Sequence, residues 1–263
     1  MGKLYGDSVL VTGANRGIGL EFVKQIATCV EPPAHIFAGT RNPDESRELK
    51  QLAELHKAKT AIHLIRLAVD SPADINAAAA AISTVVGDKG LNLILNNAGI
   101  MDTTQTLEGS SFEKTAYSYA VNATGPFIVV QAMLPLLREA ARSSGASATD
   151  MAANKCAVVM ISTDASSISG NEYGSQCIGF AYPASKAAQN MLTRTLSVDL
   201  KAEGILVVGV TPGFVATAAD GHSYADGAIS AEESVQAMLG SVVKCTADNS
   251  GNLYDRHGTA IPF

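Results

Sequence analysis

The stretch Thr12-Gly13-Ala14-Asn15-Arg16-Gly17-Ile18-Gly19 decides the fold of this chain. It follows directly on a short apolar run, residues 8–11, and leads at once into a helical pattern. Gly13 permits a tight turn, Gly17 lets the backbone approach a pyrophosphate, and Gly19 allows the helix to pack closely on the strand. The helix N-terminus adds free N–H groups and the positive end of the helix dipole. The stretch therefore predicts a dinucleotide-binding loop, and because no Walker lysine follows, it disfavours a nucleotide triphosphatase.

The rest of the chain continues this alternation of short apolar runs and longer helical patterns. Predominantly apolar runs, as expected of strands buried on both faces, lie at residues 8–11, 34–38, 62–67, 91–95, 157–161 and 205–210. Helical spacing of apolar residues predicts helices over 17–30, 43–56, 73–86, 112–121, 126–142 and 184–201. The pattern predicts an α/β fold: a single domain over residues 1–263, of the Rossmann type, with a doubly wound, mostly parallel sheet and helices on both faces.

Two segments depart from this alternation. Residues 143–154 are small and polar and lie between a predicted helix and a predicted strand, which indicates a mobile surface insertion. Residues 164–181 form a long stretch of Ser, Gly, Asn and a few apolar residues directly after a strand. Because active-site loops emerge at the carboxyl ends of strands, the second segment is predicted to be a substrate loop.

Composition excludes several classes of protein. The 263 residues are 47% hydrophobic and carry a net charge of −6, which argues against binding nucleic acid or an anionic membrane through bulk charge. The longest apolar stretches, such as residues 77–86, are about half the length of a membrane span. The N-terminus has neither the apolar core of a signal peptide nor an Arg-rich transit helix, so the expected location is cytoplasmic. The four cysteines and five histidines show no metal-binding spacing, so no metal site is expected.

The end of the second predicted strand bears on the choice of cofactor. The chain reads Gly39-Thr40-Arg41 where an acidic residue would hydrogen-bond the adenosine ribose of NADH. Arg41 and Arg16 could together hold a ribose 2′-phosphate, because guanidinium groups match phosphate oxygens in geometry and charge. The sequence therefore favours NADPH/NADP+ over NADH, with a plain surface role for Arg41 as the alternative.

A tyrosine and a lysine stand four residues apart in Tyr182-Pro183-Ala184-Ser185-Lys186, at the start of a predicted helix. One helical turn places both on the same face. A nearby ammonium group stabilises a phenolate and is expected to lower the pKa of Tyr182 towards neutral pH, as proton transfer by a tyrosine requires.

Taken together, these motifs resemble the short-chain dehydrogenase/reductase family along nearly the whole chain, and within it the sniffer-type carbonyl reductases. The motifs that carry the resemblance, in chain order, are Thr12 to Gly19, Asn96-Asn97-Ala98-Gly99, Asn122, the pair Tyr182 and Lys186, and Pro212-Gly213-Phe214-Val215-Ala216-Thr217. The insertion before residue 155 and the ending Tyr254-Asp255-Arg256-His257-Gly258-Thr259 favour the sniffer-type group.

The resemblance implies a carbonyl reductase in which Tyr182 is the general acid and hydride arrives from NADPH. Lys186 would lower the pKa of Tyr182 and bind the nicotinamide ribose, while Asn122 would hold a water that resupplies protons; a capping or kink role for Asn122 is the alternative. The resemblance also assigns residues to cofactor binding. They are Gly13, Asn15, Arg16, Gly17, Ile18 and Gly19 in the loop, Arg41, Val69, Asn97, Ala98 and Gly99 along the adenosine, and Pro212, Gly213, Val215 and Thr217 beside the nicotinamide.

The chain departs from the family pattern at two places. Where the family shows a Ser-Ser pair this chain has Ser162-Thr163, and the strand register favours Thr163 over Ser162 as the hydroxyl that polarises the substrate. An aspartate that often lies near the adenine is displaced here to Asp70, which could equally cap the next helix, so Val69 alone is assigned to the adenine.

Two other functions fit the sequence less well. A non-catalytic NADPH-binding regulatory protein of the same fold would be expected to lack the tyrosine, the lysine or the hydroxyl, and a hydrolase would need a Gly-x-Ser-x-Gly elbow that the chain lacks. The substrate pocket is expected from residues 164–181, 214–230 and 253–263, with Tyr173, Ile178, Phe180, Phe214 and Tyr224 suiting an aldehyde, ketone or quinone. The resemblance further implies a homodimer or homotetramer built on the helices near 112–142 and 184–201.

Overall fold

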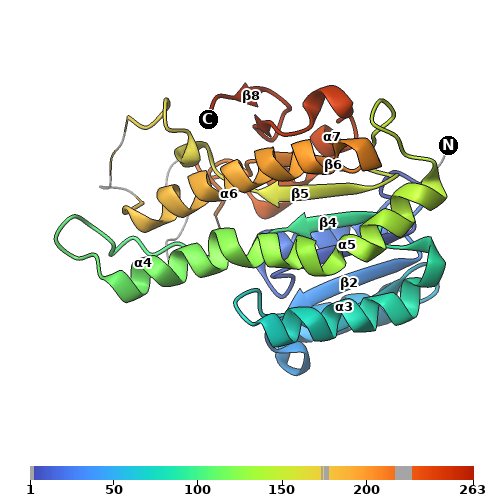
Figure 1. Ribbon diagram of the computed structural model, residues 1–263. Helices are drawn as coiled ribbons and strands as arrows, with labels where there is room; N and C mark the ends of the chain where they lie inside the picture. The colour runs from blue at the N-terminus through green and yellow to red at the C-terminus, as the bar shows by residue number, and fades with distance from the viewer. Residues whose placement is uncertain (1–2, 173, 175–177, 217–226) are drawn as a thin grey trace.

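An eight-stranded sheet forms the centre of the protein (Figure 1). The computed structural model describes residues 3–172, 174, 178–216 and 227–263. The strand order is β3-β2-β1-β4-β5-β6-β7-β8, and every pairing is parallel except that of β7 with β8. The strands are β1 (Ser8–Thr12), β2 (His35–Thr40), β3 (Ala61–Arg66), β4 (Leu93–Asn96), β5 (Ala157–Ile161), β6 (Leu206–Val210), β7 (Leu253–Tyr254) and β8 (Ala260–Ile261).

Helices cover both faces of this sheet. The α-helices are α1 (Gly17–Thr28), α2 (Arg47–His56), α3 (Pro72–Val86), α4 (Phe112–Tyr119), α5 (Gly125–Ser144), α6 (Ala181–Asp199) and α7 (Ala231–Val242). Shorter turns are the 3-10 turns η1 (Pro43–Glu45), η2 (Gly87–Lys89), η4 (Asp164–Ser166), η5 (Lys201–Glu203) and η6 (Ala247–Asn249), and the π-helical turn η3 (Ala120–Thr124). In Figure 1, α3, α5 and α6 lie in front of the sheet.

Each strand contributes alternate side chains to two separate apolar cores, because successive residues of a strand point to opposite faces. Val9 and Val11 of β1 belong to the core under α1, α2 and α7, whereas Leu10 belongs to the core under α3 and α5. Continuously apolar strands therefore mean a sheet covered on both sides, and the predicted α/β fold of the Rossmann type is confirmed.

The strand order reverses between β1 and β4, which lie side by side although three crossovers separate them in the chain. At such a reversal the connections leave on opposite faces of the sheet, and a crevice opens beyond the carboxyl ends of the two strands. The loop after β1 and the loop after β4 both end at this edge, so the topology places the predicted cofactor motifs together.

The structure differs from the predicted elements in several places. The predicted helix over 43–56 is interrupted at Ser46, whose backbone is not helical, and consists of η1 and α2. The predicted helices over 112–121 and 126–142 are joined end to end by the π-helical turn η3. The helix α7 was not predicted, although Val235, Met238, Leu239 and Val242 have helical spacing. The strands β7 and β8 have two residues each, too few to show a periodicity.

The segment 143–154 is less solvated than its composition indicated. The helix α5 extends to Ser144, and Met151 and Ala153 are buried in the core under α1 and α7. The prediction of a purely surface insertion is therefore wrong at these two apolar side chains, which bury their surface against that core. The mobility of the segment stays a prediction.

Among the described residues, one helical stretch, Phe112–Ser144, is long and apolar enough by length and composition to cross a membrane, which the apolar runs of the sequence did not predict. It comprises α4, η3 and α5, and 56% of its most apolar window is buried inside the protein. Val129, Met133 and Leu137 of α5 lie in the core against the sheet. The apolar character of the stretch is thus accounted for by packing within the fold, as in the core helix of a globular domain.

Gly19 provides a test of how closely α1 must approach the loop after β1. A Cβ atom at this position would lie 2.1 Å from the backbone oxygen of Gly13, which cannot move away without distorting the turn. We expect Gly19→Ala to lower the free energy of unfolding by about 1–3 kcal/mol, measured by urea denaturation.

The matched control is Gly240→Ala in α7, where a Cβ would meet nothing within 4 Å. This second helical glycine should gain about 0.5–1 kcal/mol on the same replacement, because alanine loses less backbone entropy on folding. A Gly19→Ala protein as stable as Gly240→Ala would show that the helix does not need this approach.

Candidate active site

A cleft opens at the carboxyl edge of the sheet, over the switch point between β1 and β4. The glycine-rich turn forms one wall, and Gly13 and Gly17 have backbone φ angles of 65° and 53°, values that favour glycine. Six predicted residues of this turn line the cleft: Gly13, Asn15, Arg16, Gly17, Ile18 and Gly19. The helix α1 begins at the cleft; its first turn has no acidic residue, and within the described chain no side chain caps it. Its free N–H groups can therefore bind an anion.

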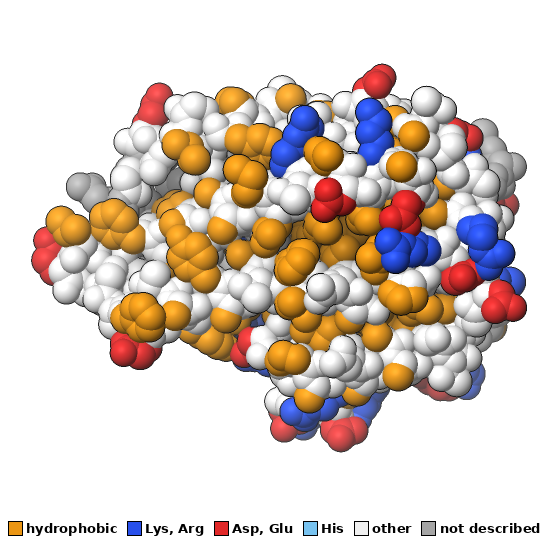
Figure 2. Space-filling model, viewed as in Figure 1, with side chains coloured by type: hydrophobic (Ala, Val, Ile, Leu, Met, Phe, Trp, Pro, Cys, Tyr) orange, Lys and Arg blue, Asp and Glu red, His pale blue; other side chains and the backbone are white. Residues whose placement is uncertain are grey.

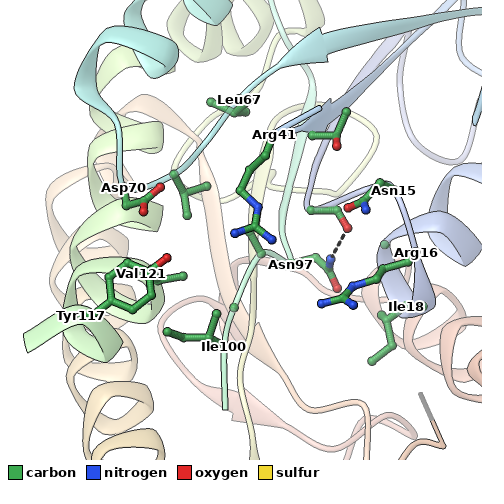
Figure 3. Close-up of a pocket in the computed structure, with 17 residues that line it drawn as sticks. Asn15, Arg16, Ile18, Arg41, Leu67, Asp70, Asn97, Ile100, Tyr117 and Val121 are labelled. Carbon is green, nitrogen blue, oxygen red and sulfur yellow. Dashed lines mark hydrogen bonds between the residues drawn. The ribbon is translucent and has the colours of Figure 1, made fainter. Parts of the chain in front are cut away.

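The loop after β4 is tied directly to the loop after β1. The hydroxyl oxygen of Thr12 accepts hydrogen bonds from the backbone N–H groups of Asn97 and Ala98, both at 3.0 Å. The side-chain amide of Asn97 donates to the carbonyl oxygen of Thr12 at 2.9 Å and to that of Gly13 at 3.3 Å, and the second bond is the dashed line in Figure 3. Asn97, Ala98 and Gly99 line the cleft as predicted, and Asn97 has an additional role as the connection between the two walls.

The two predicted arginines extend into the cleft from different elements. Figure 3 shows Arg41, just beyond β2, and Arg16, from the turn before α1, both directed into the open space. Val69, which was assigned to the adenine, lines the cleft, and Asp70, which was not assigned, lines it too. The cap of α3 is Ser71, whose hydroxyl accepts from the Asp74 N–H at 3.2 Å, so Asp70 is not the helix cap.

Several lining residues were not predicted: Thr40, Leu67, Ile100, Tyr117 and Val121. Thr40 directly precedes Arg41 and Leu67 lies two residues before Val69, and the ends of strands were the signal that could have found them. Tyr117 and Val121 come from α4 and η3 and are four residues apart, so they share a face of the helix (Figure 3). No motif marks them, because they reach the cleft only through the packing of α4 beside it.

Tyr182 and Lys186 lie on the first turns of α6, as predicted. The Lys186 side chain is 4% exposed, and its Nζ donates to the carbonyl oxygen of Ile161 at 2.6 Å and to Oε1 of Gln189 at 3.1 Å. Burial lowers the pKa of Lys186 to about 7.

The pKa of Tyr182 is not lowered in this structure. Burial raises it to about 12; a side-chain hydrogen bond with Thr163 acts in the lowering direction, and the negative charge of Asp164 raises it further. The expectation that Lys186 brings the pKa of Tyr182 towards neutrality is therefore wrong in this structure, because the loss of hydration around the phenol is the largest influence on that pKa.

Ser162 and Thr163 point to different surroundings, as adjacent residues at a strand end should. The Ser162 hydroxyl is buried and donates to Oδ1 of Asn190 in α6 at 2.8 Å. The Thr163 side chain is partly exposed, its hydroxyl donates to Oδ1 of the neighbouring Asp164 at 3.1 Å, and it is close enough to Tyr182 to act on the pKa of that phenol. Of the two hydroxyls, that of Thr163 is therefore the one beside the tyrosine.

Asn122 lies in the π-helical turn η3 and is fully buried. Its amide donates to the backbone oxygen of Ile100 at 2.8 Å and to the Ser185 hydroxyl at 3.0 Å, and its Oδ1 accepts from the Ile100 N–H at 2.8 Å. Both amide hydrogens are thus used, and one lone pair of Oδ1 remains. A Cβ on Gly99 would lie 3.2 Å from this oxygen and 3.6 Å from Lys186 Nζ, so both polar atoms face the space above Gly99.

The predicted turn on the nicotinamide side follows β6 but is not part of the cleft lining. Gly213 has a φ of 74°, and the guanidinium of Arg256 lies so close that a Cβ on Gly213 would be 2.4 Å from it. Pro212 accepts through its carbonyl oxygen from the Ser234 hydroxyl at 2.7 Å, and Val215 forms a bridge with Ile229. Thr217 lies outside the described residues, as do Tyr173 and Tyr224 of the expected pocket.

Comparison with known proteins gives consistent matches over most of the chain. The family profile described as "short chain dehydrogenase" matches residues 7–227. An uncharacterized oxidoreductase of Schizosaccharomyces pombe is 30% identical over 98% of both chains.

Two solved structures superpose on nearly the whole chain. A carbonyl reductase from chicken fatty liver, in a structure with NADPH bound, is 35% identical, covers 98% of this chain and 99% of its own, and has a TM-score of 0.90. The carbonyl reductase Sniffer of Drosophila melanogaster is 30% identical, with 98% and 100% covered and a TM-score of 0.90.

The buried lysine makes a prediction for stability that does not depend on any activity. Since the pKa of Lys186 falls from 10.5 in the unfolded chain to about 7 in the fold, the unfolded chain binds the extra proton between these values. Above pH 10.5 the lysine is neutral in both states and its burial costs no stability. As the pH falls towards 7, the unfolded chain binds the proton first, so the free energy of unfolding falls. Lys186→Met should therefore stabilise the protein most at pH 6.5 and progressively less at pH 8.0 and 9.5, measured by urea unfolding.

The control for this series is Lys59→Met, which removes an exposed lysine. Its difference from the wild type should stay constant across the same three pH values. A constant difference for Lys186→Met as well would show that the ammonium group is not destabilised by burial.

Proposed function

The chain belongs to the short chain dehydrogenase family, and from that premise we propose that it is an NADPH-dependent reductase that converts a carbonyl compound to an alcohol. The observation that carries this proposal is the meeting of Tyr182, Thr163 and Lys186 at the carboxyl edge of the sheet, beside the cleft. The two carbonyl reductases that superpose on the chain support it.

NADPH is the cofactor that fits the cleft best. The uncapped N-terminus of α1 and the glycine-rich turn suit a pyrophosphate, and Gly99 leaves space where any side chain would meet Asn122. Arg16 and Arg41 extend into the same cleft and suit a 2′-phosphate. When bound there, NADPH supplies the hydride, as the NADPH-bound relative from chicken supports.

Tyr182 would transfer the proton to the carbonyl oxygen. Its raised pKa means that the phenol is protonated at neutral pH, so the proton is available when negative charge develops on the substrate oxygen. The hydroxyl of Thr163, beside that of Tyr182, would donate a hydrogen bond to the same oxygen and stabilise the charge. Ser162 is the weaker candidate for this role, because it is buried and bonded to Asn190 in the interior, whereas Thr163 is partly exposed and bonded only to its exposed neighbour Asp164.

Lys186 and Asn122 would support the tyrosine rather than contact the carbonyl. Lys186 would hydrogen-bond the nicotinamide ribose with its ammonium group. The free lone pair of Asn122 Oδ1 and Lys186 Nζ both face the space above Gly99, where a water could pass protons back towards Tyr182. Pro212, Gly213, Val215 and Thr217 would bound the nicotinamide side of the site.

The substrate would bind between the loop 164–181 and the C-terminal tail. The hydroxyl of Ser169 donates to the backbone oxygen of Phe263 at 3.1 Å, which joins these two segments. Phe180 and Phe214 are 48% and 60% exposed, and Ile178 is partly exposed, so apolar surface is available at the mouth of the site. An apolar or aromatic aldehyde, ketone or quinone would suit it.

The remaining expectations belong to the same proposal. We infer a single catalytic domain that works in the cytoplasm and acts on a small molecule, without nucleic acid or membrane. A homodimer or homotetramer would use the face of α4, α5 and α6 in Figure 2, where apolar side chains gather between widely spaced charges. Phe112, Met191 and Val198 are among the exposed apolar side chains of these helices.

The roles of the two arginines predict a change in cofactor preference. Arg41→Ala should raise the KM for NADPH about 10-fold or more and leave the KM for NADH within a few-fold, because a charge-assisted hydrogen bond contributes about 1.5–3 kcal/mol. Arg16→Ala should act in the same direction. Steady-state kinetics with both cofactors measures this, and Arg47→Ala, an exposed arginine on α2, is the control. Equal losses for NADPH and NADH would contradict a 2′-phosphate site.

The proposed function itself is tested by NADPH oxidation at 340 nm with a panel of quinones, aromatic aldehydes and ketones. Tyr182→Phe should lower kcat by about 10²-fold or more while NADPH still binds. Thr163→Val should lose a comparable share of kcat, since it removes a hydrogen-bond donor to the developing charge.

Ser162→Ala is the matched control for Thr163→Val, and it should keep kcat within a few-fold while lowering stability, because Oδ1 of Asn190 loses its donor. Retained activity in Thr163→Val and lost activity in Ser162→Ala would move the role to Ser162. Tight NADPH binding with no turnover of any compound would favour the non-catalytic regulatory protein instead.

A further inference from the structure

Gln189 is a buried amide that the motifs of the sequence do not mark. It follows Lys186 by three residues on α6, so both side chains lie on the same face of the helix. Its side chain is fully buried, and its Oε1 accepts a hydrogen bond from Lys186 Nζ at 3.1 Å. This is the only side-chain acceptor for Lys186 among the described residues; the other acceptor is the backbone oxygen of Ile161, at 2.6 Å.

The position is a costly one for an amide. Nε2 of Gln189 is buried without a hydrogen-bond partner among the described residues, and burying an unpaired amide donor costs about 1–3 kcal/mol. An apolar side chain of similar size would avoid this cost. The structural feature that offsets it is the bond from Oε1 to a charged donor, which is stronger than a bond between neutral groups.

We propose that Gln189 is a positioning residue that holds the Lys186 ammonium group in place and stabilises its charged form. This inference rests on the proposed function, in which the ammonium is the form that binds the ribose and supports Tyr182. An ammonium group has three N–H donors. With Ile161 and Gln189 accepting two of them, the third is left for the space above Gly99, which Nζ faces.

The surroundings of Lys186 leave little else to stabilise its charge. Burial, which favours the neutral amine, is the cause of its lowered pKa. Strand β5 and turn η3, which flank this part of α6, carry no titratable side chain. Tyr182 is the titratable residue one turn before it on α6. The titratable side chains of α4 and η4, which pack on α6, are exposed: Glu113, Lys114, Tyr117, Tyr119 and Asp164. The Gln189 oxygen is thus the polar side-chain atom that opposes the effect of burial.

The test measures the pKa of Lys186 directly, without cofactor or substrate. Protein labelled with 13C at the lysine Cε is titrated by NMR, and Lys186→Met identifies the signal. Gln189→Met, which keeps the size and removes the acceptor, should lower the pKa of Lys186 by about one unit. Gln189→Glu should raise it, because a carboxylate favours the ammonium.

Thr193→Val is the control on the same helix. Thr193 is as buried as Gln189, but its hydroxyl donates to the backbone oxygen of Gln189 and does not contact Lys186. This variant should leave the pKa of Lys186 unchanged. An unchanged pKa in folded Gln189→Met, or an equal shift in Thr193→Val, would overturn the proposal.

Kinetics then connects the pair to the reaction. In Gln189→Met the alkaline limb of the kcat/KM profile should move to lower pH by the same amount as the NMR titration, and in Gln189→Glu to higher pH. If the NMR shifts occur but no variant or wild type turns over a substrate, the proposed function fails while the role of Gln189 towards Lys186 stands. If turnover occurs but the alkaline limb of its kcat/KM profile lies at the same pH in the wild type and in the Gln189 variants, the proposal for Gln189 fails and the proposed function stands.

Discussion

The hydrogen bonds between the ends of β1 and β4 are the interaction on which the rest of the structure depends. Thr12 accepts from two backbone N–H groups of the loop after β4, and Asn97 returns two hydrogen bonds to the loop after β1. The reversal of strand order between β1 and β4 opens a crevice, and these bonds close its base. They also leave no room beside Gly19, so that α1 must start against the turn with its N–H groups facing the cleft.

The second requirement is a helix whose buried face is polar. Most of the fold is held by apolar contacts on the two faces of the sheet, but α6 buries Ser185, Lys186, Gln189, Asn190 and Thr193. Each of these finds a partner at the end of β5 or just after it, on η4, on the π-helical turn or within α6 itself. In a low-dielectric interior such bonds are strong and directional, which holds the side chains near Tyr182 in defined positions. The same burial moves the pKa values of Tyr182 and Lys186 in opposite directions.

The sequence was informative wherever local chemistry decides the outcome. The glycine spacing at 13–19 requires a particular turn, and the runs of β-branched residues require strands covered on both faces, so the loop and six of the eight strands could be predicted. It was not informative where contacts between distant segments decide. Tyr117 reaches the cleft through the packing of α4. Asp70 lines the cleft and does not cap α3, because Ser71 is the cap of that helix. The burial of Met151 depends on a core built from α1 and α7.

By itself, then, the sequence determined the α/β architecture and the place of the cofactor loop, which follow from side-chain type and spacing along a single helix or strand end. Its resemblance to a known family marked the tyrosine, the lysine and the hydroxyl-bearing pair as candidates for the active site. The tertiary structure alone decided that Ser162 is buried and bonded to Asn190, that Lys186 is buried against Ile161 and Gln189, and that burial controls both pKa values. Exposure to water and the partners of a buried donor are properties of the packed chain, since segments far apart in sequence create them together.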